Sequence, residues 1–353
     1  MKENIQIKLF TAADLRQYFM HSQPVDLLSE RVIAPVRAYA MIMNPYVKDD
    51  MALVSAIFVD GEVAAYTYAF PDKLEKPDRL LFWNTVLYVD PKYEGRGYGY
   101  VVIGQMVEQY GDAYFDLDAV PASVENLKYA GLTVEYVDQY VLDQKQIHTD
   151  TFRGKLARSV ETIRLLCVSR KKELQSLLKD ADYTLAYRNY IDDEAYDFIR
   201  KHSGNDLFLR SQQMLNWILT YPFAQESPVC NRVQCSYAFA SIASTFRFYA
   251  VEVRKNGQLA GVYIMRHAKG ELYLNYLYFD ADYKNDVFLS IAEHVIKFQE
   301  PRFFAAHREV CDFIADFHLF AKQYVYKKSF SYPDDFVYDK TKFIQAGDGD
   351  NIT

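Results

Sequence analysis

Three glycines alternate with other residues in the run Tyr93-Glu94-Gly95-Arg96-Gly97-Tyr98-Gly99-Tyr100, which lies between an apolar strand pattern and an apolar helix pattern. Glycine carries no Cβ and adopts positive φ readily, so a loop of this composition exposes its backbone N–H groups. The start of the following helix adds a partial positive charge. The run therefore predicts a cradle for a diphosphate, and the alternative that the same glycines permit is a tight turn with no ligand.

Two apolar segments position this loop. Residues 80–89 are dense in β-branched and aromatic side chains and predict a strand, which Asp90-Pro91 ends because proline cannot continue a ladder. Apolar residues recur at helical spacing over residues 101–110 and predict a helix that stops at Gly111. The glycines therefore lie between a strand and a helix N-terminus.

The loop matches neither of two common nucleotide motifs, because it has no Gly-Lys-Ser/Thr ending and no Gly-x-Gly-x-x-Gly spacing. The order of strand, Asp-Pro-x-Tyr-x-Gly-x-Gly-x-Gly and helix resembles the acetyl-CoA loop of the GCN5-related N-acetyltransferase family. The usual family pattern has Arg or Gln where this chain has Glu94, which places a negative charge beside a diphosphate that Arg96 partly offsets. The resemblance implies acetyl-CoA as the acyl donor, with its pyrophosphate bound by Glu94, Gly95, Arg96, Gly97, Tyr98, Gly99 and Tyr100.

The resemblance also implies roles outside the loop. Backbone amides of Leu87, Tyr88 and Val89 would hold the pantetheine arm and polarise the thioester. Asn126 would contact the coenzyme or cap a turn. Tyr129 would serve as the general acid that protonates the leaving thiolate, although the spacing from Tyr129 to Gly131 is shorter than in the family pattern.

The sequence leaves the general base open between two kinds of group. Family members often carry a glutamate in the strand before the loop, whereas this strand has no carboxylate. A water held by Asn84 or Thr85 is one alternative, and a carboxylate from Asp116 or Asp118 is the other.

The chain repeats the same order of elements twice. The first half reads as strands 51–59 and 62–70 joined by a turn at Asp60-Gly61, then the 80–89 strand, the loop and its helix. The first half continues with strand 113–117, helix 122–129 and strand 133–142. The second half repeats this order with segments 248–253, 259–267, 271–279, 287–298, 302–306, 309–317 and 322–330.

The repeat predicts an α+β protein of two tandem modules similar to this acetyltransferase family, each a mixed, mostly antiparallel sheet flanked by helices. We place the coenzyme-binding module at 1–150, a basic helical linker at 151–180 and a degenerate module at 181–353. Two unrelated α+β domains are the alternative, and the linker helix could instead lie on a membrane surface or a partner. The second module has Tyr283-Lys284-Asn285-Asp286-Val287 in place of the glycine loop, so we expect it to have lost coenzyme binding.

Composition narrows the class of protein further. The 353 residues carry a formal net charge of -7, which argues against nucleic-acid binding through phosphate neutralisation. No segment is long enough to span a bilayer, so we expect a soluble, cytoplasmic protein. The four cysteines form no Cys-x-x-Cys pair, and we expect reduced thiols and no metal site, with His307 and His318 around Cys311 as a weak alternative. We expect the small polar tail, residues 343–351, to be frayed.

These features together predict an N-acetyltransferase that moves an acetyl group from acetyl-CoA to an amine. The acceptor is open between a small amine, an amino sugar, an amino acid and a protein lysine, and the oligomeric state is not readable. The alternative is an inactive acyl-CoA-binding or protein-interaction module. Peptidoglycan-bridge aminoacyltransferases also pair two such modules, but their aminoacyl-tRNA substrate fits poorly with the acidic balance of this chain.

Overall fold

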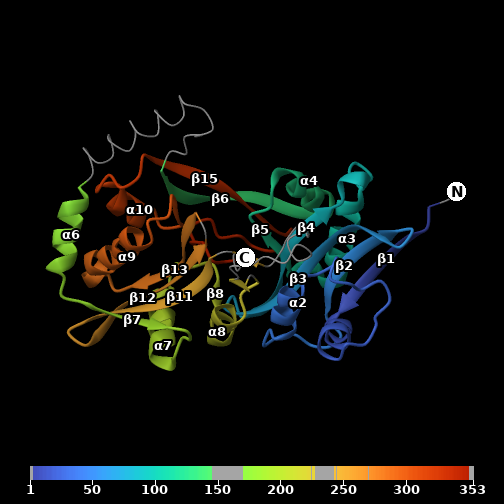
Figure 1. Ribbon diagram of the computed structural model, residues 1–353, viewed down its shortest axis with the longest axis horizontal. Helices are drawn as coiled ribbons and strands as arrows, with labels where there is room; N and C mark the ends of the chain where they lie inside the picture. Colours follow the sequence, from blue (N-terminus) through green and yellow to red (C-terminus); the bar gives the residue numbers. More distant parts are fainter. Residues whose placement is uncertain are drawn as a thin grey trace. The chain divides into compact units, whose positions relative to one another are not determined.

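The computed structural model describes residues 3–144, 170–223, 225–226, 242–243, 245–268 and 270–349 (Figure 1). The described chain forms two compact units. Unit 1 comprises residues 1–137, 205–246 and 328–353, and unit 2 comprises residues 138–204 and 247–327. Most of the predicted 151–180 linker lies outside the described residues.

Unit 1 contains the first repeat together with two later segments of the chain. Its helical elements are α1 (Ala12–Leu15), the π-helix η1 (Arg16–Met20), α2 (Pro35–Ile42), η2 (Pro91–Tyr93), α3 (Tyr98–Tyr110), η3 (Gly111–Ala113), α4 (Pro121–Tyr129) and α8 (Gln212–Thr220). Its strands are β1 (Ile5–Thr11), β2 (Ala52–Val59), β3 (Glu62–Lys76), β4 (Arg79–Val89), β5 (Tyr114–Leu117), β8 (Leu209–Arg210), β9 (Gln225–Glu226), β10 (Ile242–Ala243) and the end of β15 (Lys322–Pro333).

Unit 2 contains the second repeat. Its helical elements are α6 (Lys171–Lys179), α7 (Asp193–His202), η5 (Ala281–Tyr283), α9 (Lys284–Phe298) and α10 (Arg308–Ala315). Its strands are the end of β6 (Leu132–Asp143), β7 (Thr184–Arg188), β11 (Phe246–Lys255), β12 (Gln258–Ala268), β13 (Glu271–Phe279) and β14 (Arg302–Ala305). The predicted fold class, two repeats that each form a mixed sheet flanked by helices, is confirmed.

The two units have the same strand order. The sheet of unit 1 runs β1-β2-β3-β4-β5-β15, and the sheet of unit 2 runs β7-β11-β12-β13-β14-β6. In both, the fourth and fifth strands are parallel, and the sixth is antiparallel to the fifth. The sixth strand of each unit comes from the end of the other repeat. Each packed unit is therefore discontinuous in sequence and does not coincide with one repeat of the chain.

Local sequence explains the central hairpins. Asp60 and Gly61 both have positive φ, 52° and 82°, as the two-residue turn between β2 and β3 requires, and Asn256 and Gly257 repeat this geometry between β11 and β12. β3 is longer than predicted because it continues through Pro71. Its pairing with β2 has already ended at Tyr68, and β8 pairs with β3 only from Leu74 onward, so the missing N–H of Pro71 disrupts neither ladder.

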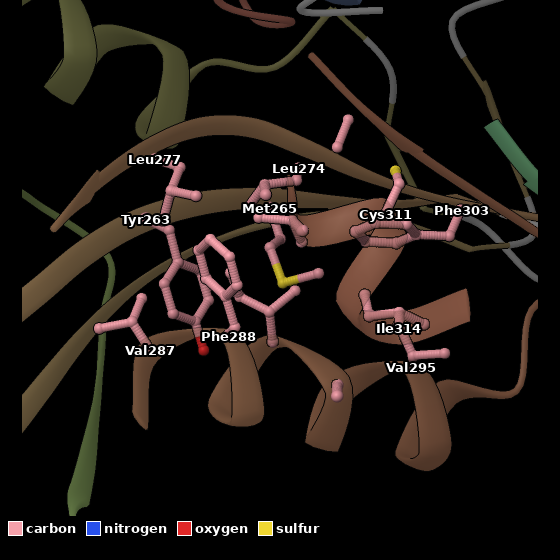
Figure 2. Close-up of a cluster of buried hydrophobic side chains, with 14 of the residues drawn as sticks. Tyr263, Met265, Leu274, Leu277, Val287, Phe288, Val295, Phe303, Cys311 and Ile314 are labelled. Carbon is pink, nitrogen blue, oxygen red and sulfur yellow. The ribbon is translucent and has the colours of Figure 1, made fainter. Parts of the chain in front are cut away.

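Helices cover the sheets through apolar faces. In unit 1, α3 packs on β2, β3 and β4 (Figure 1), with Val102, Ile103 and Met106 fully buried. In unit 2, Figure 2 shows Tyr263 and Met265 of β12 pointing toward α9, which contributes Val287 and Phe288 to the same buried cluster. Each unit therefore has its own core.

Candidate functional site

The glycine loop of unit 1 has the backbone geometry that the sequence predicts. Gly95 and Gly97 have φ of 76° and 79°, in the left-handed region that disfavours residues with a Cβ. Gly97 is the N-cap of α3, and the first turn of α3 holds no acidic side chain. The first amides of a helix have no acceptor within the helix, so this N-terminus offers donors and partial positive charge to an anion.

Gly99 is explained by close packing, whereas Gly95 and Gly97 are explained by their left-handed backbone. A Cβ on Gly99 would lie 3.0 Å from Asn126 Nδ2 and 3.4 Å from Val89 Cγ2. Gly99 therefore lets α3 approach β4 and α4 closely. The three predicted coenzyme-binding segments, represented by Val89, Gly99 and Asn126, meet at this point.

The cations near the loop are paired with acids. Arg96 Nη1 donates to both carboxylate oxygens of Glu3, at 3.0 and 2.9 Å, and its guanidinium lies 5.2 Å from the ring centroid of Tyr93. Lys92 Nζ lies 2.9 Å from Glu62 Oε2. Glu94 is exposed. The bond to Glu3 raises the pKa of Arg96 and satisfies a charge that a phosphate would otherwise attract.

This pairing predicts that a Glu3→Gln variant binds acyl-CoA about two- to fivefold more tightly than the parent chain at low salt, because a phosphate no longer competes for Arg96. Calorimetric titration at two salt concentrations measures the effect, which should shrink as salt screens the charges. Glu108→Gln removes the same charge from the far end of α3 and is the control. Equal affinities for Glu3→Gln, Glu108→Gln and the parent chain would contradict the prediction.

The strand before the loop carries a backbone irregularity. The register between β3 and β4 shifts so that Val86 has no partner on β3, and Val86 has a φ of 65°. A β-branched residue in the left-handed region is a conformational outlier, and such strain clusters at functional sites. The bulge directly precedes Leu87, Tyr88 and Val89, which are half-buried.

β4 also separates from its parallel neighbour beside this bulge. In the described chain, β4 and β5 pair only at Phe82 with Tyr114 and at Trp83 with Phe115, although β4 continues alongside β3 to Val89. The edge of β4 from Leu87 to Val89 therefore lies beyond the ladder with β5. Backbone donors on such an edge are suited to bind an extended ligand containing amides.

Asn84, predicted as catalytic, is buried, and both polar atoms of its side chain form hydrogen bonds. Its Nδ2 donates to Asp116 Oδ2 at 2.6 Å, and its Oδ1 accepts from the hydroxyl of Tyr114 at 2.8 Å. Burial and the nearby Asp116 carboxylate raise the pKa of Tyr114 well above its ordinary value. Oδ1 also accepts from the hydroxyl of Thr67 at 2.7 Å, so a water could bond the Asn84 oxygen only by replacing one of these two hydroxyl donors.

Tyr129, predicted as the general acid, lies at the C-terminal end of α4 with 75% of its surface exposed. Asn126 is one turn earlier on α4 and donates through Nδ2 to the carbonyl of Ala122 at 3.1 Å. The catalytic role of Tyr129 stays a prediction.

The second repeat differs at the loop and at the start of the helix that follows it. α9 begins at Lys284 after Tyr283, whose φ is -110°, and its first turn holds Asp286. Lys255 Nζ lies 2.9 Å from both carboxylate oxygens of Asp286. A side-chain carboxylate with its own counterion thus occupies the first turn of this helix, where an incoming anion would meet like charge.

A buried ionic cluster in unit 1 is a feature that the sequence did not predict. Arg210 Nε lies 2.8 Å from Asp72 Oδ2, which also accepts from Trp83 Nε1 at 2.8 Å. The guanidinium donates to the carbonyl of Gly349 at 2.5 Å. Asp348 belongs to the same cluster, and burial, with the nearby Asp206 carboxylate, raises its pKa to about 8 despite the charge of Arg210.

The expectation of a frayed tail is therefore wrong for residues 344–349, which are buried in unit 1. Gln345 donates from its backbone N–H to Asp348 Oδ2 at 2.9 Å, and from Nε2 to Asp206 Oδ2 at 3.2 Å. The sequence signal was weak, because two acids beside two glycines are typical of solvated ends. The burial of Asp348 is explained by Arg210, which is distant in the chain.

Three further observations concern metal binding, the cysteines and membrane-spanning helices. Among the described residues no group of three or more His, Cys, Asp or Glu side chains is arranged to hold a metal ion. Cys311 is a buried free thiol whose pKa is raised by burial, and the other three cysteines lie outside the described residues. No helix in the described ranges combines the length and apolar character needed to cross a membrane.

Solved structures share this fold. A GCN5-related N-acetyltransferase from Kribbella flavida aligns over 93% of this chain and 71% of its own, at 11% identity and a TM-score of 0.50. Saccharomyces cerevisiae N-myristoyltransferase with bound myristoyl-CoA aligns over 98% of this chain and 85% of its own, at 9% identity and a TM-score of 0.51. The chain has the GCN5-related N-acetyltransferase fold.

These two structures are named for different acyl groups, acetyl and myristoyl. The shared fold alone therefore does not identify an acyl group for this chain. No family model matches the chain, and no curated protein matches its sequence. The similarity is one of structure at very low identity, and it shows the fold alone.

Proposed function

We propose that the chain is an acyl-CoA-dependent N-acyltransferase, with acetyl-CoA as donor and an amine as acceptor, and that unit 1 binds the coenzyme. The observation that carries the proposal is the contrast between the repeats. The first repeat has left-handed glycines before a helix with no acid in its first turn, whereas Asp286 fills the corresponding turn of the second. The predicted loss of coenzyme binding by the second repeat remains part of this proposal.

The proposed roles follow the geometry of unit 1. Glu94 to Tyr100 hold the pyrophosphate through backbone amides, and Asn126 lies beside the start of α3. Backbone amides of Leu87 to Val89 hold the pantetheine arm and donate to the thioester oxygen, where negative charge develops during acyl transfer. The neutral amine attacks the thioester carbon and loses one proton to a base, for which a water held by Asn84 or Thr85 and the carboxylates of Asp116 and Asp118 are the candidates. The C–S bond breaks, the leaving thiolate takes a proton, and an amide and free coenzyme A result. Tyr129 is the proposed donor of that proton.

The rival function is an acyl-CoA-binding protein without turnover. One observation favours it, because β4 has no carboxylate and both polar atoms of Asn84 are already hydrogen bonded. Asp116 is next to β4, where its carboxylate accepts a hydrogen bond from Asn84 itself.

Thiol release from acetyl-CoA and from myristoyl-CoA, measured with a panel of small amines, amino sugars, amino acids and lysine peptides, tests the proposal. We expect release that requires both an amine and the acetyl donor, and a slower rate for Tyr129→Phe at unchanged acetyl-CoA affinity. Binding of acetyl-CoA with no release from any acceptor would support the rival. Faster release from myristoyl-CoA would overturn the acetyl assignment.

A further inference from the structure

Four buried polar side chains connect three strands at the point where β4 and β5 separate. Thr67 on β3 has its hydroxyl 2.7 Å from Asn84 Oδ1 and 2.7 Å from the carbonyl oxygen of Val86. Asn84 on β4 bonds Tyr114 and Asp116 on β5. None of these four side chains belongs to a residue more than 4% exposed. We call Thr67, Asn84, Tyr114 and Asp116 the splay network.

The splay network lies between the end of the β4–β5 ladder and the Val86 bulge of β4. On one side, the β4–β5 ladder ends at Trp83 with Phe115, and Asn84 and Asp116 are the next residues of the two strands. On the other side is the Val86 bulge, whose carbonyl accepts from Thr67. The hydroxyl of Thr67 has one proton, so the carbonyl of Val86 and the amide oxygen of Asn84 compete for it.

The second repeat shows what happens without these polar groups. β12 and β13 have the same register shift, and the residues that correspond to Thr67, Asn84 and Asp116 are Ile264, Tyr273 and Phe304. The rings of Tyr273 and Phe304 stack with centroids 4.1 Å apart. β13 and β14 stay paired two residues further, at Tyr273 with Phe304 and at Leu274 with Ala305, directly before the bulge.

A side-chain bridge explains this difference. The Asn84 amide bonds the Asp116 carboxylate across the gap, whereas the backbones at the corresponding point of unit 2 are paired in register. Buried polar groups that lose one partner are costly, so each member of the network constrains the others. Through Thr67 the constraint extends to the strained carbonyl of Val86.

We propose that the splay network is a positioning device that holds β4 and β5 apart and anchors the carbonyl of Val86 within the bulge, so that the Leu87 to Val89 backbone faces acyl-CoA. Asn84 is then a positioning residue rather than a group that touches substrate. The inference rests on the proposed function, because it assigns the network's purpose to that coenzyme.

Thr67→Val tests the device, since it removes the hydroxyl at nearly constant volume. We expect acetyl-CoA to bind this variant about tenfold more weakly, with a comparable further loss in kcat for thiol release. Thr67→Ser keeps the hydroxyl and should return affinity to within about threefold of the parent chain. Ser55→Ala is the matched control, because Ser55 lies opposite Thr67 on β2 and its buried hydroxyl has no hydrogen-bond partner in the described residues.

The possible results distinguish the positioning role of the splay network from the proposed function. Loss of affinity in Thr67→Val, rescue in Thr67→Ser and no change in Ser55→Ala support the device. Parent-like affinity and kcat in Thr67→Val, or equal losses in Thr67→Val and Thr67→Ser, overturn it while leaving acyl-CoA binding intact. A parent chain that binds no acyl-CoA overturns the proposed function and this inference together. Should Thr67→Val not fold, Asn84→Asp and Asp116→Asn are compared instead, and the device predicts weakened binding in the first, where two carboxylates face each other.

Discussion

A Gly97→Val variant is expected to bind acetyl-CoA about 100-fold more weakly than the parent chain, a loss of about 2.7 kcal/mol. Gly97 has a φ of 79° at the N-cap of α3, and a β-branched residue in that region costs about 1–2 kcal/mol even before any contact is considered. No atom lies within 4 Å of a Cβ placed on Gly97. The new side chain would therefore stand in the open space where the diphosphate approaches.

Gly104→Val provides the matched control for this variant. Gly104 lies on the same helix with an ordinary helical backbone, and a Cβ there also meets no atom within 4 Å. We expect its affinity for acetyl-CoA to equal that of the parent chain. Calorimetric titration of the three proteins makes the comparison, and a circular-dichroism melt checks that Gly97→Val is folded. An unchanged affinity in folded Gly97→Val would remove the glycine loop from coenzyme binding.

An Asp348→Asn variant is expected to be more stable than the parent chain at alkaline pH. Burial raises the pKa of Asp348 from 3.8 to about 8, and the facing charges are Arg210, Asp206 and Asp72. The folded state keeps this proton up to a pH of about 8, whereas the unfolded chain releases it near 3.8. The stabilising contribution of the protonated group is therefore fully present below a pH of about 4 and is lost as the pH rises toward about 8.

Asparagine resembles the protonated carboxyl and still accepts a hydrogen bond from the backbone of Gln345. The free energy of unfolding of Asp348→Asn should exceed that of the parent by about 3 to 5 kcal/mol at a pH of about 9, and by much less at a pH of about 5. Urea denaturation at both pH values measures the difference. Asp335→Asn, which changes an exposed acid in the turn after β15, is the control and should show no pH-dependent gain. A difference for Asp348→Asn that is equal at both pH values would contradict this account of the cluster.

Local patterns predicted much of the fold because its central elements depend on neighbours in sequence. The Asp60-Gly61 turn, the strand over residues 80–89 and the helix before Gly111 each carry their own signal. The same applies to Gly95 and Gly97, whose left-handed conformations follow from residue type and position. The second repeat has the same order of elements without the glycines, and this difference is the basis for assigning the coenzyme to the first repeat.

The parts that sequence did not predict depend on distant contacts. The sixth strand of each unit comes from the end of the other repeat, and no periodicity within β6 or β15 specifies its partner. Burial of Asp348 depends on Arg210, and the engaged side chain of Asn84 depends on Thr67 and Asp116. From sequence alone, polar residues at such positions indicate solvated strand ends, because their distant partners are not visible there.

The most direct test of the central claim is the stoichiometry of acetyl-CoA binding to the 353-residue chain by calorimetric titration. Unit 1 carries the only glycine loop of this type in the sequence, so we predict one acetyl-CoA per chain, with binding greatly weakened by Gly97→Val and unchanged by Gly104→Val. Two bound molecules per chain, or one whose affinity Gly97→Val does not change, would contradict the assignment of the coenzyme to unit 1. No detectable binding would contradict the proposed function itself.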